Sequence, residues 1–335
     1  MEVYLFEPEK YNLLYNCSFY DWNIIPREER RHRFLAVILL FFYFATISLY
    51  VPCLAAMMSS ENRRRSSYQL MFLLGCMHIC GLQTCGLMTG IHGYYGHVFC
   101  DFPREMYFFG SMGVSMWCAS TMTSLFLGIN RCVELLSVYW ADVLFGGYCK
   151  LFWIITPIAY FFMFFFFTPS AFFNGQMMTW FFNPHYGYYE DVDLRYESFF
   201  HSVNNLFVIV AHSGVYVLFF FIYIRRTRMA QTEKKLRDNS TYIQILLLGL
   251  IHLIAAISYV VIQYLPVNFY STLVASAAYL GSHGMPPLIY ICCNKTIRMW
   301  IQRKIFGLHQ KIGNSAEFSK FRSHRVSSEG ATNLH

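Results

Sequence analysis

The sequence predicts an all-α integral membrane protein, a seven-transmembrane helix bundle followed by a short amphipathic eighth helix. Composition is the first observation: 56% of the 335 residues are hydrophobic and only 13% are charged, against roughly 25% charged in an ordinary soluble domain. The second is a series of long uncharged segments, each exceeding the roughly 20 residues that cross a bilayer core as a helix. The third is that runs such as Phe161 to Phe167 are continuously apolar, whereas a membrane β-barrel needs alternating strands.

Segments without Asp, Glu, Lys or Arg place the spans. The last of them is long enough for two helices, and Leu265-Pro266-Val267-Asn268 separates these because proline lacks the amide donor of a helix. The uncharged segments are 34–60, 66–100, 106–130, 151–189, 198–224 and 239–294. The seven predicted spans cover about 34–58, 68–92, 105–130, 150–168, 198–224, 241–264 and 270–293.

Three further segments flank this bundle, which occupies 34–293. Residues 1–33 contain many charges and no apolar core of a cleaved signal peptide, so we expect the first span to act as its own targeting signal. Residues 294–306 alternate apolar and basic side chains at helical spacing, which is typical of an amphipathic helix at a membrane surface. The polar segment 307–335 is expected to be a disordered cytosolic tail.

The basic residues are unevenly divided between the two sides of the predicted bundle. Of the 26 Lys and Arg residues, 19 lie in four segments on one side, at 59–67, 131–150, 225–240 and after Asn294, and seven lie on the other side. The positive-inside rule therefore places residues 1–33 outside the cell and the carboxyl end in the cytosol. Arg30, Arg31 and Arg33 before the first span disagree with the rule, and the bias of the other loops outweighs them.

Two features are expected on the outer side in this topology. Eleven cysteines are present, but only Cys17 and Cys100 fall on the oxidising side, and the others are intramembrane or cytosolic, where disulfides are rare. We predict a disulfide between Cys17 and Cys100, and two free thiols are the alternative. Asn16, in the sequon Asn16-Cys17-Ser18, is the predicted glycosylation site.

Three short motifs stand within or just after the predicted spans. Asn130-Arg131-Cys132-Val133-Glu134 ends the third predicted span and is similar to the arginine motif of rhodopsin-like receptors. Pro287-Leu288-Ile289-Tyr290 in the seventh span is similar to the proline-x-x-tyrosine motif, and 294–306 to the eighth helix. The resemblance implies that Asn130, Arg131, Pro287 and Tyr290 form a signalling switch.

A second set of short motifs is distributed over roughly residues 15 to 306. They are Tyr15-Asn16-Cys17-Ser18, Trp22, Leu49-Tyr50-Val51-Pro52-Cys53-Leu54, Phe99-Cys100, Pro103, Asn130-Arg131-Cys132, Leu144-Phe145-Gly146, Phe172-Phe173-Asn174, His283-Gly284 and Tyr290. With them the chain resembles the nematode serpentine receptor class T. This resemblance implies a chemoreceptor in the plasma membrane of sensory neurons, at their cilia, that binds an external small molecule and activates a heterotrimeric G protein.

The chain departs from the wider rhodopsin-like pattern at three places. His78 stands where those receptors usually have a sodium-binding aspartate, which argues against sodium regulation. The segment 170–197 has no cysteine, so the usual loop-to-helix disulfide is absent, and Cys17 is the remaining partner for Cys100. The sixth span lacks the tryptophan-x-proline switch.

Polar residues follow helical spacing along the second, fifth, sixth and seventh spans and predict faces that meet inside the bundle. Those near the outer end are our candidates for a ligand pocket, and without a fixed charge they favour an uncharged ligand. We assign four deeper histidines to packing or to the switch: His78, His212, His252 and His283. For the histidines and the pocket candidates alike, the alternative is that each side chain only forms hydrogen bonds with neighbouring helices. The pocket candidates are His92, His201, Asn204, Asn205, Gln263 and Tyr264.

Several other function classes are excluded or disfavoured. An opsin needs a lysine in the seventh span, and none lies between Ser271 and Asn294. The 12 histidines are dispersed, and the predicted spans hold no paired carboxylates, so we expect no enzyme, cofactor or metal site and no proton-coupled transport. The expected partners are a small molecule, a G protein and the lipid bilayer, and no nucleic acid. The rival hypothesis is an inverted-topology seven-span ligand-gated cation channel, with the amino terminus inside.

Overall fold

The structure, a computed structural model, describes residues 1–230, 240–264, 267–304 and 307. Contacts divide the chain into Met1–Arg298 and Met299–His335, and of the second unit only the last residues of helix α14 and Gly307 are described. Within the described residues, six helices are long and apolar enough to cross a membrane. The predicted fold class, an all-α membrane bundle, is confirmed. The predicted tail 307–335 lies outside the described residues apart from Gly307.

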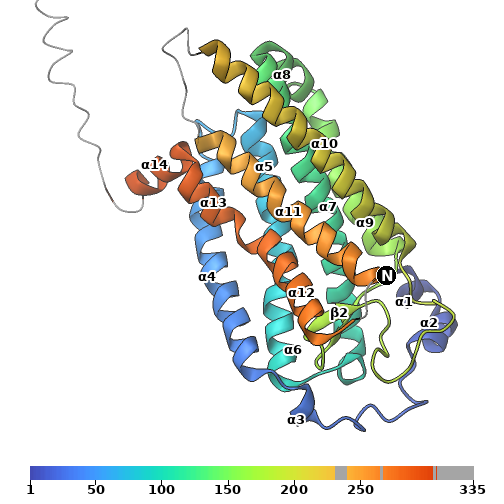
Figure 1. The fold of residues 1–335 in the computed structure, drawn as a ribbon. Helices are drawn as coiled ribbons and strands as arrows, with labels where there is room; N and C mark the ends of the chain where they lie inside the picture. Colours follow the sequence, from blue (N-terminus) through green and yellow to red (C-terminus); the bar gives the residue numbers. More distant parts are fainter. Residues whose placement is uncertain (231–239, 265–266, 305–306, 308–335) are drawn as a thin grey trace, which may run out of the picture. The chain divides into compact units, whose positions relative to one another are not determined.

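The bundle consists of these long helices and a divided helix at the position of the predicted seventh span (Figure 1). Helices α12 (Phe269–Gly284) and α13 (Pro286–Cys293) meet at Met285. Prolines at the first two positions of α13 lack the amide hydrogens that would join it to α12. The long helices are α4 (Arg33–Met57), the series α5 to α6 (Ser66–Tyr95), α7 (Pro103–Leu136), α9 (Cys149–Phe167), α10 (Phe199–Ala230) and α11 (Ser240–Tyr264).

The second span is irregular in its middle. Between α5 (Ser66–Leu82) and α6 (Thr89–Tyr95) the chain forms the π-helix η1 (Gln83–Met88), a geometry that widens one turn and is frequent at functional sites. The hydroxyl of Thr84 in this turn donates to the carbonyl of Phe109 on α7 at 2.9 Å. Gly96 ends α6 in the left-handed conformation, with φ of 72°, which glycine adopts without strain.

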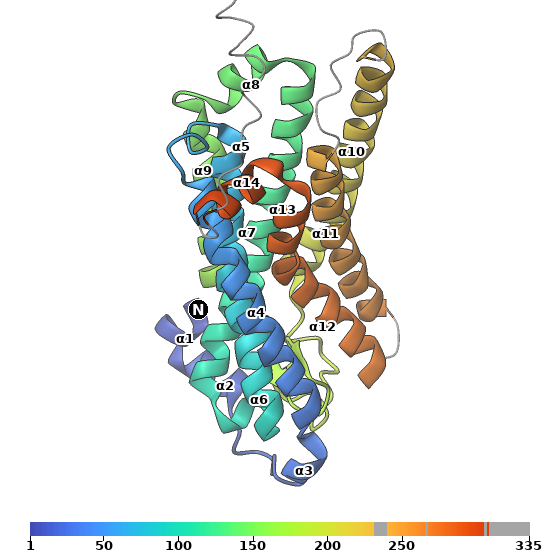
Figure 2. The same ribbon diagram turned by 90° about the vertical axis from the view of Figure 1, so that its left-hand side faces the viewer.

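Short elements gather at one end of the bundle, which we call the hairpin end (Figures 1 and 2). A two-stranded antiparallel sheet lies there, with Phe172 opposite Phe181 and Asn174 opposite Thr179. The other end, where α7 finishes, is called the Arg131 end, and α8 (Val138–Phe145) follows there. The elements of the hairpin end are α1 (Glu2–Phe6), α2 (Pro8–Tyr15), α3 (Arg27–Arg30), η2 (Phe99–Asp101), β1 (Phe172–Asn174) and β2 (Thr179–Phe181).

Helix α7 is the central helix of the bundle, in contact with α5, α9, α10 and α11. The Trp117 side chain of α7 is buried in a core cluster together with Tyr50, Phe164 and Tyr279. In contrast, α4, α9 and α10 expose large apolar side chains such as Phe41, Phe162 and Phe221. Since lipid tails are as apolar as these side chains, the exposed faces suit a bilayer, and close packing and hydrogen bonds hold the helices together.

The last described helix is α14 (Lys295–Lys304), on the residues of the predicted amphipathic helix. It begins at Asn294, whose side-chain oxygen accepts the backbone N–H of Ile297 at 3.1 Å. This is the geometry of a helix N-cap, and it explains why the helix restarts immediately after α13. Residues 305–306 of the predicted segment lie outside the described residues.

Candidate functional site: a cavity below the hairpin and a polar cluster at the opposite end

A cavity of about 140 Å³ lies between the hairpin and the helices of the bundle. Five of its residues come from the hairpin segment, and the others come from the second span, α7, α10, α11 and α12. None of these lining residues is charged, and aromatic side chains predominate. The lining residues are Thr84, Gly110, Gly113, Val114, Trp117, Ala171, Thr179, Trp180, Phe181, Phe182, His201, Tyr259, Ile262, Thr272 and Tyr279.

Hydrogen bonds hold the hairpin over this cavity. Trp180 Nε1 donates to the Thr89 hydroxyl on α6 at 2.8 Å, and the Ser276 hydroxyl on α12 donates to the Thr179 hydroxyl at 2.7 Å. Helix α7 also approaches the segment so closely that a Cβ atom at Gly110 would collide with the carbonyl oxygen of Ala171. The hairpin is therefore fixed to at least three spans, and a molecule in the cavity would contact all of them at once.

The inner end of the cavity is formed by Trp117 and Tyr279. The indole Nε1 of Trp117 donates to Asn205 Oδ1 on α10 at 2.8 Å, and the hydroxyl of Tyr279 donates to the Gly113 carbonyl on α7 at 2.8 Å. Both bonds are buried and join different helices. A ligand that moves either ring therefore changes a contact between spans.

Below these rings lies a layer of buried histidines from four spans. His78 and His283 approach with their Nδ1 atoms 2.8 Å apart, and the ring of His252 lies 5.5 Å from that of His78 and 6.2 Å from that of Trp117. His212 is 6.1 Å from His252. In the described part of the chain, no group of three or more His, Cys, Asp or Glu side chains is arranged to hold a metal ion.

The predicted pocket residues occupy different places. His201 lines the cavity, and Asn205 lies behind Trp117. Asn204 instead accepts a hydrogen bond from the Tyr160 hydroxyl on α9 at 3.0 Å, and His92 pairs with His97 beside the cavity rather than in its lining, with Nδ1 atoms 3.1 Å apart. The side chains of Gln263 and Tyr264 lie outside the described residues.

The predicted switch residues lie on two helices, α7 and α13. Arg131 forms an ion pair of 2.8 Å with Glu134, one turn further along α7, and its Nη2 contacts the Met71 sulfur on α5 at 3.7 Å. Asn130 donates to the Ser66 hydroxyl at 3.1 Å. Pro287 and Tyr290 are buried in α13, and the Pro287 carbonyl accepts the thiol of Cys53 at 3.8 Å.

A second polar group at this end links three helices and had not been identified from the sequence. Asn294 Nδ2 donates to Gln244 Oε1 on α11 at 3.0 Å, and the Tyr68 hydroxyl on α5 donates to Asn294 Oδ1 at 3.3 Å. Gln244 Nε2 in turn reaches Met71, the residue that Arg131 contacts. We call Tyr68, Met71, Gln244 and Asn294 the amide cluster. Its sequence signal was a glutamine and an asparagine at the ends of apolar spans.

At the hairpin end, the structure joins Cys17 and Cys100 in a disulfide with Cα atoms 5.8 Å apart. Tyr20 beside it hydrogen-bonds to His185 Nδ1 at 2.9 Å, and His185 Nε2 donates to the Leu14 carbonyl at 3.2 Å. Burial lowers the pKa of His185 from its usual 6.5. The amino-terminal segment is thus attached both to the start of α7 and to the segment that follows the hairpin.

Asn16, the predicted glycosylation site, is exposed, and its Oδ1 accepts the backbone N–H of Ser18 at 2.9 Å. It lines a second, wider hollow of about 860 Å³ between the amino-terminal helices and the start of α7. A glycan at this position would project at the hairpin end.

Sequence reasoning missed the residues that cover the cavity. Trp180, Phe181 and Phe182 belong to a segment between two spans that had been assigned no secondary structure. The available signal was the concentration of aromatic residues in that segment, since exposed loops are seldom so apolar.

Comparisons with known proteins agree on one family. The sequence model of the family described as "Serpentine type 7TM GPCR chemoreceptor Srt" matches residues 2–314. Serpentine receptor class T-55 of Caenorhabditis elegans is 24% identical over 243 residues, which cover 69% of this chain and 63% of that relative. The match therefore spans less than two thirds of the relative's length. Because the family model covers nearly the whole chain, the chain belongs to the Srt family of serpentine seven-transmembrane chemoreceptors, which are multi-pass membrane proteins.

Proposed function

We propose that this chain is a chemosensory receptor that binds an uncharged external small molecule in the cavity below the hairpin and activates a heterotrimeric G protein from its Arg131 end. The observation that supports this most is the cavity itself, which five described helices and the hairpin enclose without a charged side chain. A neutral aromatic lining favours neutral or weakly polar ligands, because a charged ligand would lose its hydration without gaining a counter-charge.

The divided seventh span offers a route between the two ends. Thr272 and Tyr279 on α12 line the cavity, and Pro287 and Tyr290 lie on α13 beyond the break at Met285. Asn294, which follows α13, belongs to the amide cluster. A ligand that displaces Tyr279 would therefore change the angle between two short helices, and such a joint is a common way to convert a small shift into a larger one.

At the Arg131 end, release of Arg131 from Glu134 would expose a basic side chain to the G protein. The Arg131 side chain is 11% exposed and the Glu134 side chain is 37% exposed, so water screens this ion pair only in part. A rearrangement of α5 and α11 around Met71 would release it.

The proposed location is the plasma membrane of sensory neurons, at their cilia, with residues 1–33 and the hairpin end outside and the carboxyl end in the cytosol. Three facts support this sidedness: the excess of basic residues on the Arg131 side, the disulfide at the hairpin end and the exposed sequon at Asn16. No observation favours the inverted ligand-gated channel, and the chemoreceptor family does not favour it either.

Two valine-to-phenylalanine variants, one in the cavity and one outside it, test the proposal. Val114 lines the cavity and is 8% exposed, whereas Val210 on α10 is 66% exposed on an outer face. Cells expressing the receptor with a G-protein reporter would be exposed to a panel of neutral volatile alcohols, ketones and esters. Val114→Phe should abolish the response to the active compounds at equal surface expression, and Val210→Phe should leave it unchanged. Equal responses in both variants would refute binding in this cavity.

A further inference from the structure

Most polar side chains that line the cavity below the hairpin already bond to the protein itself. The Thr84 hydroxyl donates to the Phe109 carbonyl, and the Tyr279 hydroxyl donates to the Gly113 carbonyl. Each hydroxyl has thereby given its only hydrogen to the backbone, so it cannot donate to a ligand. The other lining side chains that take part in hydrogen bonds of this kind are Trp117, Thr179, Trp180 and Thr272.

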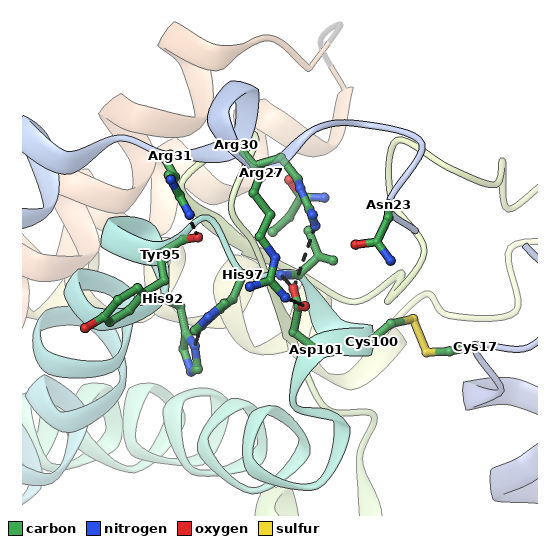
Figure 3. Close-up of polar contacts among 12 residues, drawn as sticks. Cys17, Asn23, Arg27, Arg30, Arg31, His92, Tyr95, His97, Cys100 and Asp101 are labelled. Atoms are coloured by element: carbon green, nitrogen blue, oxygen red, sulfur yellow. Dashed lines mark hydrogen bonds and ion pairs between the residues drawn. A yellow bond between two sulfur atoms is a disulfide. The ribbon is translucent and has the colours of Figure 1, made fainter. Parts of the chain in front are cut away.

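Two polar groups of the lining are left over, Tyr259 Oη on α11 and His201 Nε2 on α10. Among the described residues neither atom has a hydrogen-bond partner, yet neither is sealed off as the unpartnered Nε2 atoms of the deeper histidines are. The Tyr259 and His201 rings meet edge to face, with centroids 6.3 Å apart. His92 is not available, because it pairs with His97 outside the lining (Figure 3). The side-chain groups that a ligand can bond to therefore lie together, between α10 and α11.

Hydrogen bonds determine which nitrogen of His201 carries the hydrogen. The Trp117 indole N–H is a donor only, so Asn205 accepts it through Oδ1 and turns its amide Nδ2 towards His201. This Nδ2 lies 3.5 Å from His201 Nδ1, and because an amide nitrogen only donates, Nδ1 has to accept. In a neutral imidazole the hydrogen is then on Nε2. Both groups left over in the cavity, His201 Nε2–H and Tyr259 O–H, are therefore hydrogen-bond donors.

The volume of the cavity restricts the size of the ligand. It measures about 140 Å³, and an apolar protein cavity of about 150 Å³ holds one benzene molecule. A ligand of roughly six to eight non-hydrogen atoms is therefore expected to fill it. Apolar side chains such as Val114, Phe181 and Ile262 form much of the remaining wall, and such a wall favours a hydrocarbon body.

We propose that the cavity selects compact carbonyl compounds, ketones and aldehydes of this size, whose oxygen accepts hydrogen bonds from His201 Nε2 and Tyr259 Oη. The inference rests on the proposed function, since it names the ligand class of the same cavity. A carbonyl oxygen has two lone pairs and no hydrogen, so it satisfies both donors at once. An alcohol brings a hydrogen that competes with the two donors, and a hydrocarbon of the same shape leaves both donors without a partner.

A carbonyl oxygen in this position connects three helices. Tyr259 belongs to α11 and His201 to α10. His201 is connected in turn through Asn205 to Trp117 on α7. The ligand oxygen thus becomes part of a hydrogen-bonded chain that crosses the bundle below the hairpin.

The experiment compares two molecules of the same shape, cyclohexanone and methylenecyclohexane, which differ only in the group that replaces the oxygen. The purified full-length receptor in lipid nanodiscs is titrated with each, and the affinity is taken from the saturable rise in unfolding temperature. Tyr259→Phe should lower the affinity for cyclohexanone about fivefold, the usual effect of one lost hydrogen bond, and leave that for methylenecyclohexane unchanged. Tyr160→Phe is the matched control, because the Tyr160 hydroxyl bonds to Asn204 outside the lining, and it should change neither affinity.

Histidine variants test the second donor. His201→Leu should lower the affinity for cyclohexanone by a similar factor, and His201→Gln, which restores an N–H donor, should recover part of the loss. Equal effects of Tyr259→Phe on cyclohexanone and methylenecyclohexane would overturn the proposal. So would the absence of saturable binding of cyclopentanone, cyclohexanone and benzaldehyde to the wild type, or tighter binding of cyclohexanol than of cyclohexanone.

These titrations involve no G protein, so their result is separate from that of the signalling assay. Selective binding of carbonyl compounds without G-protein activation would refute the proposed receptor activity alone. Activation by neutral ligands that Tyr259→Phe and His201→Leu do not affect would refute the carbonyl site alone.

Discussion

Replacement of Asn205 by leucine tests how the cavity is coupled to the bundle. Asn205 is fully buried, and its Oδ1 accepts the indole N–H of Trp117, which forms the inner end of the cavity. Leucine leaves that N–H buried without an acceptor, which costs about 1–3 kcal/mol. If ligand binding has to order the released indole again, the variant binds the ligand more weakly by the same free energy. A loss of about 1–3 kcal/mol lowers the affinity roughly 5- to 150-fold.

The adjacent residue provides the control. Asn204 also accepts one hydrogen bond, from the Tyr160 hydroxyl, but on the side of α10 that faces α9. Asn204→Leu should therefore destabilise the receptor to a comparable or smaller extent and leave potency unchanged. The assays are thermal unfolding in nanodiscs and a concentration series of an active compound in reporter cells. Equal potency losses in both variants would refute the idea that Trp117 connects ligand binding to the bundle.

Three further predictions concern the ends of the bundle. Cys17→Ser should lower the free energy of unfolding by about 2–5 kcal/mol, the usual cost of losing a native disulfide, and Cys17→Ser combined with Cys100→Ser should be no worse when thermal unfolding is measured. Gln244→Leu should raise basal G-protein activation about fivefold. The variant loses a hydrogen bond between α11 and Asn294 that contributes about 1 kcal/mol, and this shifts the equilibrium between resting and active helix arrangements by that factor. A basal activity equal to wild type would contradict a role for the amide cluster. Burial lowers the pKa of His185 in the folded protein, so below pH 6.5 the unfolded chain binds more protons than the folded protein does. The free energy of unfolding should therefore decrease from pH 6.5 downward. His185→Gln should make the unfolding temperature less dependent on pH in that range.

The membrane-spanning helices could be predicted from the sequence because a bilayer imposes one simple requirement. Uncharged segments of sufficient length have to be helical there, since every backbone amide needs a partner within its own segment. Helix α4 therefore begins at Arg33 and ends at Met57, close to the predicted 34–58. The division of the seventh span was not predicted, although Pro286 and Pro287 were visible, because prolines inside transmembrane helices are often accommodated without a break.

The cavity was harder to predict because it depends on contacts between distant segments. Helical spacing placed His201 and Asn205 on the inner face of α10, and one lines the cavity while the other supports Trp117. Asn204 points about 100° away from Asn205 around α10, and the sequence does not show that Asn204 meets α9 instead of the cavity. It also could not indicate that Trp180 folds back over the bundle, because this depends on pairing of β1 with β2 and on Thr89.

Arg30 illustrates a different limit. Arg30 before the first span disagreed with the positive-inside rule and was treated as an exception. In the structure its side chain is fully buried beside Asp101, where it is shielded from solvent by the hairpin end. Arg30 therefore departs from the charge rule at a position where its side chain is part of the packed hairpin end.

The central claim is that the hairpin end, with the cavity below it, faces the outside of the cell and the Arg131 end faces the cytosol. Val192 lies in the segment after the hairpin and is 81% exposed, and Cys292 is an exposed native cysteine at the end of α13. A membrane-impermeant maleimide should label Val192→Cys on intact cells, whereas the wild-type receptor should be labelled only after permeabilisation. Labelling of the wild type on intact cells, with Val192→Cys labelled no further until the membrane is opened, would contradict the account.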